Sequence, residues 1–80
     1  MMVSSVDAVI AEVLSHVLEK PVSPGENVSR ETEESWDSLK HVEILFALEA
    51  ALDVRFTEED MASITSVADI KDKVAAQHAP

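Results

Sequence analysis

Ser38 is the residue whose type and position most directly suggest chemistry, because it lies where a long polar segment gives way to an apolar one. A catalytic serine needs a general base, but no glycine-flanked turn or arranged base accompanies Ser38, and the histidines are scattered at His16, His41 and His78. Enzyme activity is therefore not expected, and a hydrolase that uses Ser38 is the weakest hypothesis. A serine at a helix N-terminus can instead carry a phosphate ester, because free amides and the positive end of the helix dipole favour an anion.

No residue pattern in the sequence indicates a metal, nucleotide or disulfide site. The chain contains no cysteine, which excludes disulfides and thiolate ligands. The histidines and acids lack metal-ligand spacing, and the acidic run over residues 26–37 lacks the alternating ligands and central glycine of a calcium loop. No glycine-rich loop is available to hold a nucleotide. We therefore expect no bound metal and no catalysis by the chain itself.

Charge is the strongest feature of the composition, since sixteen acidic and six basic residues give a net charge of −10. This charge repels a nucleic-acid backbone and favours partners with basic surfaces. It equally suits the simpler role of keeping a small protein soluble. No apolar run reaches the length that crosses a membrane, and the N-terminus lacks the features of a signal peptide. We expect a cytoplasmic monomer that binds neither nucleic acid nor membrane.

Helix-forming residues predominate in a chain that is long enough for one small domain over residues 1–80. Apolar spacing and capping residues predict helices over 4–20, 38–52, 57–62 and 66–76, with a loop over 21–37. A loop of that length is usually functional or disordered. The sequence thus predicts an all-α fold, a small antiparallel bundle of three main helices and one short helix.

Candidate capping residues support these bounds. They are Ser4 with Asp7 for the first helix, Asp37 for the second, Thr57 for the third, and Ser66 with Asp69 for the last. Val22 and Val28 are expected to pin the long loop against the helices, and Trp36 to cover one end of the core. Residues 77–80 are expected to fray.

The second helix has apolar residues on two sides. At about 100° per residue, one group consists of His41, Ile44, Leu45, Leu48 and Leu52, and the other consists of Leu39, Val42, Phe46 and Ala50. Both groups could be core. The other helices, however, offer only one apolar stripe each, and the first group already matches them. The second group, flanked by Glu43 and Glu49, is then an exposed recognition surface, because a contiguous apolar patch with an acidic rim is typical of a binding site.

The sequence resembles the acyl carrier proteins, which are phosphopantetheine-bearing carriers. The resemblance starts from Asp37-Ser38-Leu39, which is similar to the attachment motif of that family. It extends through LEAALDVRFTEEDM after the second helix and SVADIKDKV in the last one, and so covers nearly the whole chain. Length, acidity and the single domain also match the discrete, free-standing form of these carriers.

The resemblance implies a 4′-phosphopantetheine arm joined to Ser38 by a phosphodiester and transferred from coenzyme A by a phosphopantetheinyl transferase with magnesium. The thiol of the arm would hold acyl groups as thioesters. Asp37 would position the serine and meet the transferase, with Leu39 beside it. The helix-two surface that binds partners in the family falls on Leu39, Val42, Glu43, Phe46 and Glu49. The expected partners are a loading ligase, an acyltransferase or a ketosynthase with a basic docking surface, in fatty-acid, polyketide or related biosynthesis.

Two departures from the family pattern are present. Asp53 stands where the family often has glycine after the second helix, although aspartate tolerates the left-handed conformation better than most residues. Ser35-Trp36-Asp37 replaces the glycine-containing run of peptidyl carriers, which favours acyl cargo and leaves aminoacyl cargo open. The alternative function is an acidic helical adaptor that binds a basic partner through Leu39, Val42 and Phe46 without any prosthetic group.

Overall fold

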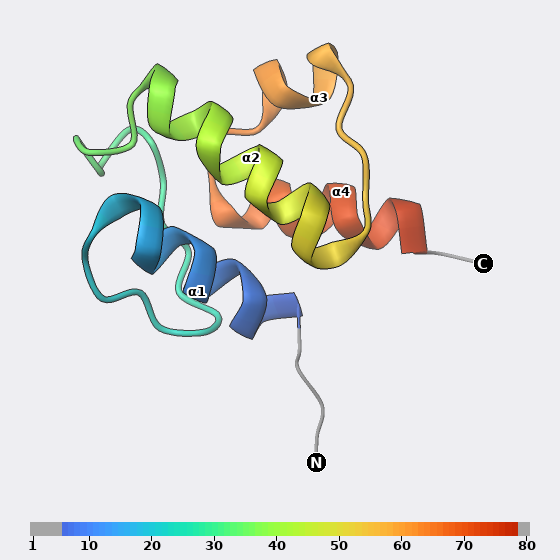
Figure 1. Ribbon diagram of the computed structural model, residues 1–80. Coiled ribbons are helices and arrows are strands. Elements are labelled where there is room, and N and C mark those ends of the chain that lie inside the picture. The colour runs from blue at the N-terminus through green and yellow to red at the C-terminus, as the bar shows by residue number, and fades with distance from the viewer. Residues whose placement is uncertain (1–5, 79–80) are drawn as a thin grey trace.

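The computed structural model describes residues 6–78, which form an all-α bundle of four helices (Figure 1). The helices are α1 (Val6–Leu18), α2 (Ser38–Leu52), α3 (Glu58–Ser63) and α4 (Val67–His78). α1 and α2 run in opposite directions and α4 lies behind α2, while α3 lies beside the first half of α2 (Figure 1). The predicted fold class is confirmed. No helix within residues 6–78 is both long and apolar enough to cross a membrane.

The core is a single cluster of apolar side chains to which α1, α2, α4 and the segments between the helices contribute buried residues. Its fully buried members are Ile10 and Leu14 from α1, Ile44, Leu45 and Leu48 from α2, Ile64 before α4, and Ile70 and Val74 on α4. Val28 and Trp36 are buried from the long loop, as predicted, and Val22 packs against the cluster. This small core leaves the chain dependent on well-satisfied polar groups at the helix ends.

The second helix has the bounds that its sequence predicts, because both of its ends are capped. Asp37 Oδ1 accepts a hydrogen bond from Lys40 N at 2.9 Å. Asp53 adopts the left-handed conformation at φ 55°, and Val54 N donates to Glu49 O at 3.2 Å, which closes the helix with a Schellman motif. The aspartate at this position therefore performs the turn for which glycine is common.

The first helix ends earlier than predicted. It ends at Leu18 rather than residue 20, because Glu19 adopts a left-handed conformation at φ 57° and Lys20 N donates to Ser15 O at 3.3 Å. The predicted start at residue 4, and with it the Ser4 cap, lies outside the described residues.

The third helix is shifted by one residue, to Glu58–Ser63, and Thr57 is its N-cap as predicted. Thr57 and Asp60 form a complete capping box, in which each side chain accepts a hydrogen bond from the other residue's amide. α3 itself contributes no buried residue. It is held instead by the partly buried Met61, which packs against the core, and by the polar contacts of Met61 O with His41 and of Asp60 with Lys73.

The last helix spans Val67–His78, so it begins one residue after the predicted start at Ser66 and ends two residues later than expected. Ser66 Oγ accepts from Asp69 N at 3.3 Å, whereas the Asp69 carboxylate accepts from Thr65 rather than completing a box with Ser66. The prediction that residues 77 and 78 fray is wrong. Gln77 accepts from Arg55 N at 2.9 Å and donates to Arg55 O, and this pairing holds the end of α4 against the segment before α3. Residues 79 and 80 lie outside the described part.

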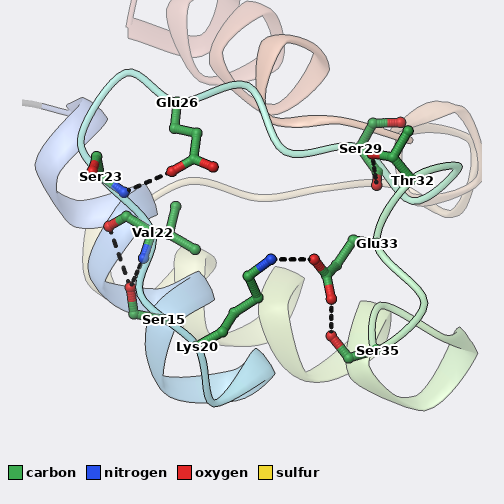
Figure 2. Close-up of polar contacts among 9 residues, drawn as sticks. All are labelled: Ser15, Lys20, Val22, Ser23, Glu26, Ser29, Thr32, Glu33 and Ser35. Carbon is green, nitrogen blue, oxygen red and sulfur yellow. Dashed lines mark hydrogen bonds and ion pairs between the residues drawn. The ribbon is translucent and has the colours of Figure 1, made fainter.

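The long loop is ordered by contacts with both sequence neighbours and distant elements. Ser29 and Ser66 form an isolated antiparallel bridge, and Asn27 Oδ1 accepts from Ala68 N at 2.9 Å, so that the loop caps the start of α4. At its other side, the Ser15 hydroxyl pairs with the backbone of Val22 (Figure 2). The loop is therefore part of the folded domain.

Candidate functional site

The segment that leads to Ser38 is anchored to the end of α1. Lys20 Nζ lies 2.5 Å from Glu33 Oε1, and the Ser35 hydroxyl donates to Glu33 Oε2 at 2.5 Å (Figure 2). The hydrogen bonds from Lys20 and Ser35 lower the pKa of the Glu33 carboxyl, and the same pairing raises the pKa of Lys20. Glu33 thus connects α1 to the chain just before Ser38.

A buried hydrogen-bond chain joins the same segment to α2 and α3. Trp36 Nε1 donates to His41 Nδ1 at 2.9 Å, and His41 Nε2 lies 2.7 Å from Met61 O. Because the indole nitrogen is only a donor and the carbonyl only an acceptor, His41 must carry its proton on Nε2. Both ring nitrogens of this buried, neutral imidazole are therefore satisfied, and the position of Trp36 is fixed two residues before Ser38.

Ser38 is the first residue of α2, and its side chain is exposed. The first intrahelical bond of α2 runs from His41 N to Asp37 O at 2.8 Å, and Lys40 N is taken by the Asp37 carboxylate. Within residues 6–78, the amides of Ser38 and Leu39 have no acceptor. Ser38 therefore stands at the positive end of the helix dipole, where its own amide and that of Leu39 are free.

The exposed face of α2 carries three large apolar side chains. Leu39, Val42 and Phe46 are 69, 40 and 56% exposed, and we call them the apolar stripe. Ala50 is exposed next to them, whereas His41, Ile44, Leu45 and Leu48 are buried on the opposite side. Of the two interpretations of the helix pattern, the one with a separate exposed face is confirmed.

The two acids predicted to flank the stripe differ from each other. Glu43 is exposed, as expected of a residue that faces a partner. Glu49 is half-buried, and its Oε2 accepts from Phe56 N at 2.8 Å. One oxygen of Glu49 is thus committed to the turn that follows α2, and the free charge beside the stripe belongs to Glu43.

Two features near Ser38 were missed by sequence reasoning. Residues Lys20 and Glu33 are distant in sequence, and nothing in the pattern of either residue predicts that they meet. His41 was assigned to the core side of α2, but its bond to Trp36 was not predicted. A tryptophan just before an N-cap and a core-side histidine in the first turns of the helix could have indicated this pair, because a buried indole N–H needs an acceptor.

Within residues 6–78, no group of three or more histidine and acidic side chains is arranged to hold a metal ion. The site therefore consists of an exposed serine with free amides, a fixed N-cap and an adjacent apolar stripe.

Comparisons with known proteins add no family assignment to this geometry. No protein-family model matches the chain, and no curated protein matches it significantly in sequence.

Proposed function

We propose that the chain is a carrier protein that holds acyl groups as thioesters on a 4′-phosphopantetheine arm attached to Ser38. The observation that carries the proposal is the exposed hydroxyl of Ser38 at the first position of α2, directly beside the apolar stripe. In this proposal the attachment point, Ser38, and the protein-binding surface, the apolar stripe, lie on one helix. The resemblance of Asp37-Ser38-Leu39 and its surroundings to acyl carrier proteins agrees with this arrangement.

The residues around Ser38 fit a phosphodiester. Its non-bridging oxygens are anionic, and the free amides of Ser38 and Leu39 are donors for them. In the transfer, the Ser38 oxygen bonds to the phosphorus that bears the pantetheine arm in coenzyme A, and the adenosine bisphosphate leaves. The serine proton goes to a base of the transferase, since no base of this chain contacts Ser38 within residues 6–78. The arm then supplies the thiol that this cysteine-free sequence lacks.

The proposal extends to the partners and to the absence of catalysis by the carrier itself. A phosphopantetheinyl transferase would load the arm, and a loading ligase, acyltransferase or ketosynthase would exchange the cargo. The net charge of −10 supports partners with basic docking surfaces. Leu39, Val42, Phe46 and Glu43 are the residues available to meet them. We propose a cytoplasmic setting and cargo of fatty-acid, polyketide or related biosynthesis.

The exposure of the stripe also supports a second function, that of an acidic adaptor without a prosthetic group. An adaptor would use the same three side chains but would not need Ser38. The two functions therefore differ in their response to Ser38→Ala, which leaves the stripe unchanged.

The deciding experiment is intact mass spectrometry after incubation with coenzyme A, magnesium and a broad-specificity phosphopantetheinyl transferase. We expect a mass gain of one phosphopantetheine group in the wild-type chain and in Ser63→Ala, which removes another exposed helical serine. Ser38→Ala should show no gain. A wild-type chain that folds but gains no mass, or a gain that persists in Ser38→Ala, would sink the carrier proposal and leave the adaptor.

A further inference from the structure

A groove between α1 and α2 lies outside the site described above. It has a volume of about 380 Å³ and is lined by Glu12, Val13, His16 and Val17 from α1 and by Ala47 from α2. Val13 and Val17 pack against the core with one side and remain half-exposed on the other. The groove exists because α2 places a small side chain, Ala47, opposite two valines of α1.

The charges around the groove are mainly negative. Glu12 is exposed on its α1 side, and Glu43 is exposed on α2 one turn before Ala47. Lys20, two residues after the end of α1, is already paired with Glu33. Lys40 lies a further turn away towards Ser38. An occupant that contacts the valines would therefore meet Glu12 in the groove and could extend along α2 to Glu43, in a chain with a net charge of −10.

We propose that the α1–α2 groove binds a short amphipathic helix of a partner protein, with apolar side chains on one face and basic residues beside them. The groove is bounded by two helices and has an apolar floor, which suits the helix-in-groove mode of recognition. Glu12 in the groove, Glu43 one turn along α2 and the net charge of −10 favour a basic rather than an acidic helix. Phe46 adjoins Ala47, so a partner that contacts the stripe could also reach this groove. The proposal does not depend on modification of Ser38.

The probe is a synthetic amphipathic helix of leucine and lysine, titrated into the ¹⁵N-labelled, unmodified full chain. We expect amide chemical-shift changes centred on Val13, Val17 and Ala47, and an affinity that weakens as salt is added. A helix with the same leucines and glutamate in place of lysine should bind at least about tenfold more weakly. Ser38→Ala should bind the lysine peptide as the wild type does.

Two variant pairs test the location. Ala47→Leu fills the groove and should weaken binding about tenfold, whereas Ala51→Leu, an exposed position one turn later on α2, should leave the dissociation constant within about twofold. Glu12→Lys should weaken binding several-fold, and Glu59→Lys, an equal charge change on α3, should do so less. Unfolding curves of each variant check the fold, and the Glu12 pair decides the question if Ala47→Leu is destabilised.

Several results would overturn the proposal. They are shifts confined to Leu39, Val42 and Phe46, equal binding by the lysine and glutamate peptides, equal effects within both variant pairs, or the absence of shifts at millimolar peptide. A dimer detected by sedimentation of the wild-type chain and lost in Ala47→Leu would also overturn the proposal, because the occupant of the groove would then be a second copy of the chain.

Discussion

α2 and α3 lie side by side but are held in place by different forces. α2 buries His41, Ile44, Leu45 and Leu48, and so its position depends on apolar packing. α3 has no fully buried residue. Apart from Met61, which packs partly buried against the core, it is held by hydrogen bonds and charges, including its capping box and the contact of Asp60 with Lys73 at 3.1 Å. The helix that carries Ser38 is therefore held mainly by apolar packing, while its neighbour depends more on polar groups whose strength varies with pH and salt.

The largest expected effect is on the packed side of α2. Ile44→Ala removes a fully buried side chain and should lower the free energy of unfolding by about 2–5 kcal/mol. Phe46→Ala, on the exposed face of the same helix, should change it by only about 0.5 kcal/mol or less. Urea denaturation followed by circular dichroism measures both. Similar losses in the two variants would mean that the two faces of α2 do not differ as described.

A smaller loss of stability is expected when the hydrogen bonds that connect Trp36, His41 and Met61 are broken. Trp36→Phe keeps an aromatic ring but leaves His41 Nδ1 buried without a donor, which should cost about 1–3 kcal/mol. The same substitution in a His41→Phe background should cost much less, because no imidazole nitrogen is then left without a donor and the loss of the partner of Met61 O is common to both chains. Urea denaturation of the four chains in this double-mutant cycle gives the coupling energy. Equal costs in both backgrounds would show that the ring packing of Trp36 matters and its hydrogen bond does not.

Loss of the N-cap of α3 is expected to reduce the stability of the protein still less. Thr57→Ala removes the acceptor for Asp60 N and should lower the free energy of unfolding by about 1 kcal/mol. Thr57→Ser retains the hydroxyl and is the matched control. Hydrogen exchange should show faster exchange in α3 than in α2 for Thr57→Ala, since α3 has no buried residues of its own. Uniformly faster exchange in both helices would contradict the separation of the two regions.

The features of α2 that depend on neighbouring residues in the sequence, namely its ends and its two faces, could be predicted. The bounds of α2 were predicted to the residue because Asp37 and Asp53 cap its two ends. Helical spacing separated Leu39, Val42 and Phe46 from the core-facing group, and their exposure was predicted because the other helices offer only one apolar stripe each. The ends of α1 and α4 were not predicted. Glu19 gives no compositional indication of a left-handed turn, and Gln77 extends α4 by pairing with Arg55 across 22 positions of sequence.

The same limit applies to the candidate site. Glu49 has the position of a surface acid in the helical pattern, and only the fold brings the Phe56 amide to it. The attachment role of Ser38, its arm and its partners rest on resemblance and remain a proposal. Their chemistry depends on molecules outside the chain.

The smallest expected effect is the response of α3 to acid. Hydrogen bonds from the Thr57 backbone, followed by that from Lys73, lower the pKa of Asp60 from its ordinary value of 3.8, and the Thr65 backbone similarly lowers the pKa of Asp69. Because both pKa values are lower in the folded than in the unfolded chain, these carboxylates add stability above their ordinary pKa. As the pH falls through the lower, folded values, that contribution is lost.

Urea denaturation of Asp60→Asn between about pH 5 and pH 3 measures this contribution. The variant should be less stable than the wild type at the upper pH and should lose less stability on acidification. Asp72→Asn, at an exposed acid of α4, and Ile44→Ala, in the packed face of α2, should both retain the wild-type dependence on pH. If Ile44→Ala reduced the pH dependence of the free energy of unfolding as much as Asp60→Asn did, the polar contacts of α3 and the apolar packing of α2 would not contribute independently to stability. The difference between the two helices predicts instead that acid loosens α3 while α2, with Ser38 at its start, stays in place.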